Sequence, residues 1–262
     1  MKYSARLLIL ALTAMLALTS VGFANLEDIL AEGEAVFVMS GEYPPFSMPD
    51  EDGNMIGFDA DVATELAARL GVDAVLQQAE FSSIIAGIQA GAFDVSVASH
   101  ARTEEREQAV QFMDAPYYYS GAQVFVPSDS EFTSIEEMSE AGATMAVDLG
   151  GTNQQYLEGV DYPEIATYSG VQDSLLAVSS GRAEGIFTSP IVGNLAIQEG
   201  RDLKAIGNLV FEETAWVTIA SDQPELQAAI NEALDEMRAD GTLLEISQRW
   251  IGGDIVTPPS ER

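Results

Sequence analysis

Short apolar runs alternate with amphipathic segments along most of the chain. Residues 35–39 form a strand-like apolar run, and residues 61–70 repeat apolar side chains at helical spacing before Gly71, a residue type that often ends helices. The alternation predicts three further elements in this part of the chain: a strand at 74–76, a helix at 81–90 and a strand at 93–98. Strand, helix and strand in this order predict βαβ units and a mostly parallel sheet.

A second series of the same kind begins near residue 122. Its predicted strands are 123–126, 144–148, 165–168 and 184–187, and its predicted helices are 135–139, 153–157 and 171–180. A final strand at 215–220 and a helix at 224–238 belong to neither series. The pattern therefore indicates an α/β protein of two units with C-terminal elements left over.

The composition narrows the class of protein. The chain has 262 residues, of which 47% are hydrophobic, so it can bury a sizeable core in one large domain or two smaller ones. It carries 42 acidic side chains against 11 Lys and Arg, a formal charge of -31, which argues against binding to nucleic acid. The absence of Cys excludes disulfides, thiolate nucleophiles and iron–sulfur clusters.

The first 24 residues have the pattern of a cleaved secretory signal peptide. Lys2 and Arg6 precede an uncharged run over 7–21, and small residues lead to a predicted cut after Ala24. An uncleaved membrane anchor is the alternative, but the run is shorter than the roughly 20 residues that span a bilayer. No Cys is present to carry a lipid. We therefore expect a protein exported to the periplasm without a lipid anchor.

Several short segments, read in order, carry a more specific signal. They are YPPF at 43–46, GFDADVA at 57–63, FDV at 93–95, TEER at 103–106, FMDAPYY at 112–118, ADGTL at 239–243 and RWIGGD at 249–254. Their order and spacing resemble those of the extracellular solute-binding proteins of family 3, which serve ABC importers of polar amino acids. The resemblance extends over almost all of residues 34–254.

The resemblance implies a two-lobed periplasmic-binding-protein fold (type II), an α/β fold with two parallel or mixed sheets joined by two hinge strands. Lobe 1 would comprise residues 25–121 and 216–262, and lobe 2 residues 122–215. We expect a monomer without a cofactor, catalytic residue or metal. The protein would close its lobes on a small carboxylate ligand, an amino acid or a similar molecule, and deliver it to the membrane permease of an ABC importer.

The resemblance also implies site residues. Arg106 occupies the position that clamps the ligand carboxylate, a task suited to the planar guanidinium. A surface Arg paired with a neighbouring Glu is the alternative. The other positions carried over are flanking aromatics, backbone contacts of lobe 1 and a glycine turn entering a helix of lobe 2: Tyr43, Phe81, Ser99, Ala101, Gly151, Thr152 and Asn153.

Two departures limit the choice of ligand. Ser189 stands where the family usually places an Asp for the ligand ammonium, and Ser40 stands where a further acid is common. Glu42, Asp148 or Asp173 could supply a substitute anion, and the sequence leaves this choice open. A carboxylate ligand without a primary ammonium group is therefore a second possibility, and Ser189 is kept as a ligand-binding position.

Other functions have less support. The glycine turn also resembles that of periplasmic cyclohexadienyl dehydratases, but the stretch 189–192 lacks the acid that would protonate a leaving group. A sensory module would normally carry a membrane helix and a signalling domain. His100 is the single His, too few for a His–His metal site, and we expect it at the surface or cleft rim. These features favour a binding protein over an enzyme.

The acidity generates a prediction about salt. Removal of Lys2 and Arg6 with the signal peptide changes the formal charge from -31 to -33, which resembles the charge of proteins that work in high salt. A periplasmic protein that is acidic without adaptation to salt is the alternative. Between 0.01 M and 1 M salt the Debye length falls from roughly 30 Å to about 3 Å, which screens the repulsion among the carboxylates. The melting temperature of the mature protein should rise steeply with sodium chloride. A flat curve over this range would contradict adaptation to high salt.

Overall fold

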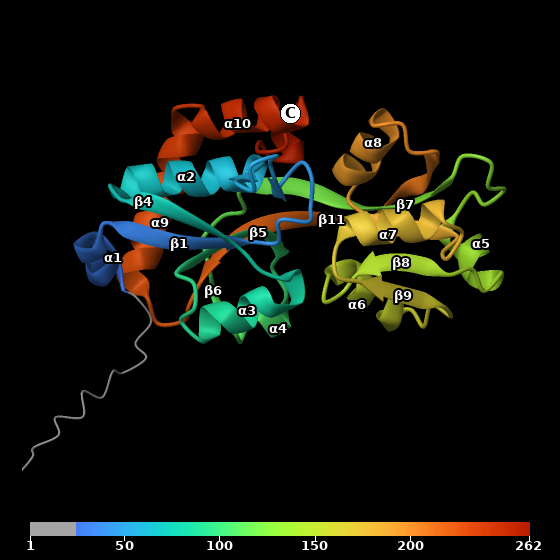
Figure 1. Cartoon of the computed structure of the whole chain (residues 1–262), viewed down its shortest axis with the longest axis horizontal. Helices are drawn as coiled ribbons and strands as arrows, with labels where there is room; N and C mark the ends of the chain where they lie inside the picture. Colours follow the sequence, from blue (N-terminus) through green and yellow to red (C-terminus); the bar gives the residue numbers. More distant parts are fainter. Residues whose placement is uncertain (1–24) are drawn as a thin grey trace, which may run out of the picture.

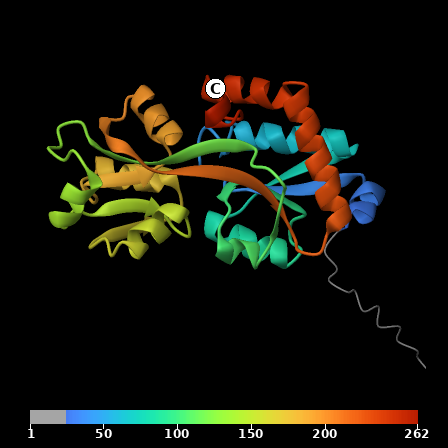
Figure 2. The ribbon, with the colours of Figure 1, turned by 180° about the vertical axis from the view of Figure 1, so that it is seen from behind.

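The computed structural model describes residues 25–262, and the predicted signal peptide at 1–24 lies outside the described residues. Two bodies stand side by side and are joined by two long strands, β7 (Tyr118–Pro127) and β11 (Leu203–Ile219) (Figure 1). The view from behind shows the two strands crossing together from one body to the other (Figure 2). We call the body that contains β1 lobe 1 and the body that contains β8 lobe 2.

Lobe 1 has parallel strands at its centre, with helices on both faces. Its helices are α1 (Leu26–Glu32), α2 (Phe58–Leu70), α3 (Phe81–Gln89), α4 (Glu104–Glu107), α9 (Pro224–Ala239) and α10 (Thr242–Ile251). Its strands are β1 (Glu34–Met39), β4 (Asp73–Gln78), β5 (Val95–Ala101), β6 (Gln111–Phe112) and a small separate pair, β2 (Met48–Pro49) and β3 (Met55–Ile56). The chain ends in a short 3-10 helix, η1 (Pro259–Glu261). Helices α2, α9 and α10 pack together, so the C-terminal elements return to lobe 1.

Lobe 2 is smaller and repeats the same architecture. Its strands are β8 (Met145–Asp148), β9 (Ile165–Tyr168) and β10 (Gly185–Thr188), and its helices are α5 (Ile135–Glu140), α6 (Thr152–Gly159), α7 (Val171–Ser179) and α8 (Pro190–Gln198). A buried apolar cluster that includes Met138, Met145 and Phe187 lies inside it. Most predicted elements of this half agree with the structure to within a few residues, while α8 was not predicted.

The strands of both lobes form one continuous mixed sheet rather than two separate ones. The 9-stranded sheet runs in the order β4-β1-β5-β11-β7-β10-β8-β9, with β6 beside β11. The β4-β1-β5 and β10-β8-β9 pairs are parallel, whereas β11 and β7 run antiparallel to each other and to their outer neighbours. The α/β fold with two hinge strands is confirmed. The predicted lobe boundaries 121/122 and 215/216 fall inside these strands and stay a prediction.

The strand predicted at 215–220 is far longer in the structure. β11 spans 17 residues, and its pairing with β7 is interrupted between Ile206 and Phe211. Gly207 and the Glu212-Glu213 pair break the apolar alternation there, so the sequence pattern shows only the last third of the strand. This extension matters because it carries β11 past the cleft between the lobes.

A buried carboxylate fixes a bulge in β5 at the edge of the cleft. Ser99 has a left-handed backbone with φ 56, a conformation that is uncommon outside glycine. Asp59 at the start of α2 is 1% exposed and accepts hydrogen bonds from the Tyr117 hydroxyl at 2.7 Å and the Ser99 hydroxyl at 2.9 Å. The Ser99 N–H donates to the same Tyr117 hydroxyl at 2.9 Å. These bonds hold α2, β5 and the segment before β7 in one arrangement.

This network predicts a pH effect on stability. Burial raises the pKa of Asp59 to about 7, although its hydrogen bonds oppose the rise. Because the folded state then binds the proton more tightly than the unfolded state, the free energy of unfolding should fall as pH rises from 4 to 8. Relative to Asp59→Asn, the wild type should lose up to about 4 kcal/mol over this range.

Urea unfolding at one fixed salt concentration and several pH values measures this difference. The exposed Glu27→Gln is the matched control, and its curve should run parallel to the wild type. If the free energies of unfolding of the wild type and of Asp59→Asn changed in parallel with pH, the Asp59 carboxyl would have the same pKa in the folded and unfolded states, and the prediction would be wrong.

Candidate ligand-binding site

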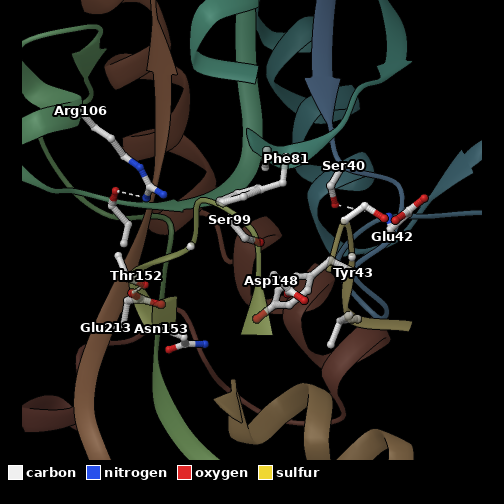
Figure 3. A pocket seen from close by; sticks show the side chains of 16 residues that line it. Ser40, Glu42, Tyr43, Phe81, Ser99, Arg106, Asp148, Thr152, Asn153 and Glu213 are labelled. Atoms are coloured by element: carbon white, nitrogen blue, oxygen red, sulfur yellow. Dashed lines mark hydrogen bonds between the residues drawn. The ribbon is translucent and has the colours of Figure 1, made fainter. Parts of the chain in front are cut away.

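A cavity lies where the two lobes meet, and both lobes contribute to its wall. Eight of the nine residues predicted for the site line it: Tyr43, Phe81, Ser99, Ala101, Arg106, Gly151, Thr152 and Asn153. Six of them, Tyr43, Phe81, Ser99, Arg106, Thr152 and Asn153, are labelled in Figure 3, where their side chains are arranged around the cavity. The structure thus brings together positions that are spread over more than a hundred residues of sequence.

Arg106 is buried in this cavity rather than placed on a helix surface. It lies in the short helix α4, which Thr103 caps by accepting a hydrogen bond from the Arg106 N–H at 3.2 Å. Its side chain donates from Nη1 to the Ala101 carbonyl and from Nη2 to the Gly150 carbonyl of lobe 2, both at 2.9 Å. The residue is 7% exposed, and burial lowers the pKa of its guanidinium.

No carboxylate pairs with this guanidinium among residues 25–262. The ion pairs there involve other Arg residues, and both measured bonds of the Arg106 side chain go to backbone carbonyls. Three of its five N–H groups therefore stay available. A buried cation of this kind is stabilised by an anion that supplies charge and acceptors together.

The N-terminus of α6 faces the same region from lobe 2. Gly151 caps the helix without a side-chain hydrogen bond, and the first turn contains no acidic residue. The first N–H groups of α6 and the positive end of its dipole are therefore open to an anion. Gly150 has φ 76, a backbone that favours glycine, and this turn brings its carbonyl to Arg106.

Three carboxylates also line the cavity. Glu42 follows β1, Asp148 ends β8, and Glu213 lies on the hinge strand β11. The Thr152 hydroxyl donates to Glu213, and the Ser174 hydroxyl donates to Asp148 at 3.0 Å. Burial raises the pKa of Glu213 and raises that of Asp148 to about 6.

The structure places the three candidates for a substitute anion differently. Glu42 and Asp148 line the cavity, whereas Asp173 is exposed on α7 and accepts a hydrogen bond from Ser169 at 3.3 Å. Glu213 was not predicted as a site residue. An extension of the predicted strand at 215–220 toward its N-terminus would have indicated it, because a strand that passes the cleft exposes alternate side chains to it.

The aromatic residues frame the cavity. The Phe81 ring lies 5.5 Å from the Arg106 guanidinium carbon and stacks on His100 with ring centroids 4.6 Å apart. Tyr43 stacks on Phe46 at 5.2 Å, and burial together with Asp148 and Glu213 raises the pKa of its hydroxyl. The expectation for His100 was wrong, because the ring is 1% exposed behind Phe81 and not at the cleft rim.

Two predicted positions have their polar groups engaged within the protein. The Ser99 N–H donates to the Tyr117 hydroxyl and the Ser99 hydroxyl donates to Asp59, so neither group is free for a ligand. Ser189 does not line the cavity, because its hydroxyl caps α8 and lies 3.0 Å from that of Ser120 on β7. A ligand contact by Ser189 stays a prediction.

Within residues 25–262, no helix is long and apolar enough to cross a membrane. The same residues contain no group of three His, Asp or Glu side chains placed to hold a metal ion.

Known proteins share both the sequence and the fold. The L-cystine-binding protein TcyJ of Escherichia coli K12 is 27% identical over 232 residues, 88% of this chain and 87% of that protein. A mutant of ArgBP from T. maritima has a TM-score of 0.82 at 27% identity and covers 87% of this chain and 99% of its own. The ancestral amino acid-binding protein AncCDT-1, a precursor of cyclohexadienyl dehydratase, has a TM-score of 0.81 at 28% identity, with 86% of this chain and 99% of its own covered.

The sequence profile of one family matches most of the chain, from residue 36 to residue 253. The matched region contains lobe 2, most of lobe 1, the two hinge strands and every residue described above for the cavity. The resemblance inferred from short motifs is therefore confirmed. This chain belongs to the bacterial extracellular solute-binding proteins, family 3.

Proposed function

We propose that the protein captures a small α-amino acid between its lobes and delivers it to the membrane permease of an ABC importer. The observation that carries this proposal is Arg106, a buried guanidinium that faces the cavity without a carboxylate partner in the described chain. The ligand carboxylate would complete this pair and accept from the open N–H groups of α6. The names of TcyJ and AncCDT-1 as binding proteins for L-cystine and amino acids are consistent with this function.

An ammonium group also suits the site. With Glu42, Asp148 and Glu213 in the wall, the cavity carries more negative than positive charge. This excess of negative charge favours an α-amino acid as the ligand over a carboxylate that lacks an ammonium group. One chain supplies both walls of the cavity, which supports action as a monomer. We also propose export to the periplasm with cleavage after Ala24, so that the mature chain begins at Asn25.

One observation favours an enzyme as the second candidate. The stretch 189–192 has no acid that could protonate a leaving group, and this absence favours a binding protein over a dehydratase. Asp148 in the lobe 2 wall, however, has a carboxyl whose pKa burial raises to about 6. A group that is partly protonated near neutral pH can act as a general acid. AncCDT-1, the precursor of a dehydratase, has a similar fold. Asp148 rather than the exposed Asp173 is therefore the residue that would carry such chemistry.

We predict that Arg106→Ala lowers the affinity for the amino acid ligand by about 2–5 kcal/mol, because it removes one partner of a desolvated charge pair. Isothermal titration calorimetry measures this loss once a thermal-shift screen has identified a ligand. Arg102→Ala is the matched control, since the Arg102 side chain pairs with Glu107 and packs over the Trp216 ring at 5.1 Å, outside the cavity. Equal affinities for the wild type and Arg106→Ala would refute the assignment of the clamp.

We also predict binding without turnover. Purified protein incubated with prephenate or arogenate should leave both compounds unchanged when they are followed by absorbance and mass spectrometry. Asp148→Asn is the control for any activity found. Turnover by the wild type that disappears in this variant would establish the dehydratase alternative.

A further inference from the structure

The charged groups of the cavity are distributed over two ends. Figure 3 shows Arg106, Thr152 and Glu213 on one side and Glu42 on the other, with Asp148 beside Tyr43. The carboxylates that act on the pKa of Arg106 are Glu213 and Glu105. The carboxylate that acts on the pKa of Asp148 is Glu42. Glu213 lies within reach of both regions, since it also raises the pKa of Tyr43. Glu42 and Asp148 lie away from the guanidinium (Figure 3), and no cation of the described chain forms an ion pair with them.

Asp148 is the more deeply placed of the two acids. Its carboxylate accepts one hydrogen bond from a side chain, that of the Ser174 hydroxyl at 3.0 Å. Asp148 takes part in no ion pair within residues 25–262. Burial is the main cause that raises its pKa, and the nearby Glu42 adds to the rise. A cation at this place would offset both effects.

Glu42 reaches this position from the opposite lobe. Its Oε2 atom would lie only 2.2 Å from a Cβ atom on Gly170, the residue that precedes α7 in lobe 2. The Glu42 carboxylate therefore rests directly on the lobe 2 backbone, and it does so because residue 170 has no side chain. Glu42 and Asp148 thus approach each other across the cleft.

A separate feature of the cavity also calls for a donor. Asn153 lines it, and its Nδ2 group donates to the Phe187 carbonyl at 3.1 Å, which fixes the direction of the amide. Its Oδ1 atom is buried, and no donor within residues 25–262 reaches it. A buried acceptor without a partner costs free energy that a donor-rich ligand can recover.

We propose that Glu42 and Asp148 form a subsite, shared by the two lobes, for a positively charged side chain of the ligand. The inference rests on the proposed function and narrows it to dibasic α-amino acids, whose carboxylate binds at Arg106 and whose side-chain ammonium or guanidinium lies between the two acids. Tyr43 and Phe81 supply apolar surface for the aliphatic stem. Because two like charges oppose the approach of the lobes, the ligand cation would also favour closure.

The test compares arginine with citrulline, which has the same length and a neutral end group. Calorimetry at fixed salt and pH 8 should show that the wild type binds arginine roughly 10- to 100-fold more tightly, as expected for a hydrogen bond to a charged group. Lysine and ornithine in the same series separate a preference for guanidinium from one for ammonium. In Asp148→Asn, the ratio of arginine to citrulline affinity should fall by a similar factor.

A second variant tests the role of Glu42 without removing a charge. Gly170→Ala places a methyl group where the Glu42 carboxylate lies, so it should also lower the arginine to citrulline ratio. Gly159→Ala at the end of α6 is the matched control, because no atom lies within 4 Å of its new methyl group. Its ratio should equal that of the wild type.

The outcomes separate the inference from the function on which it depends. A wild type that binds citrulline or another neutral amino acid as tightly as arginine overturns the cation subsite and leaves the amino acid function standing. Equal losses for arginine and citrulline in Asp148→Asn overturn it as well, since Asp148 would then act on the common part of the ligand. A folded wild type that binds no amino acid of any charge overturns both.

Discussion

The burial of one guanidinium sets the main constraint on this structure. A charged group that is 7% exposed needs strong acceptors, and Arg106 finds two in the backbone, one from each lobe. The Ala101 carbonyl comes from the end of β5, and the Gly150 carbonyl comes from a turn that requires a left-handed backbone. The position of Arg106 therefore depends on a strand of lobe 1, a glycine of lobe 2 and the hinge strands that place the two lobes.

The acids of the cavity complement this constraint. Glu213 lies on β11 near Arg106 and Tyr43, and the Thr152 hydroxyl donates to it. Asp148 lies near Tyr43 and Glu42. A molecule with separated negative and positive groups fits such a distribution better than one with a single charge. Under the proposed cation subsite, ligand selectivity would depend on where charge lies along the cavity and on the contact between the Glu42 carboxylate and the backbone of Gly170.

The agreement between predicted and observed elements has a physical cause. The segment 61–70 is bounded by turns and buries one face, so its periodicity shows in the sequence. β11 is different because it crosses from lobe to lobe, and Glu213 in this strand lines the cavity instead of a core. The sequence pattern did not predict α8, because its apolar side chains are distributed around the helix and do not repeat at helical spacing on one face.

The sequence by itself determined the α/β class, the order of the elements, the family and eight residues of the cavity wall, since these depend on local periodicity and on motifs that stay together in the chain. Only the tertiary structure decided which acids line the cavity. Asp148 and Asp173 look alike as sequence, yet one is enclosed and the other is exposed. The reason is that burial and the pairing of charges arise from segments far apart in the chain, as when Glu42 of lobe 1 meets Gly170 of lobe 2.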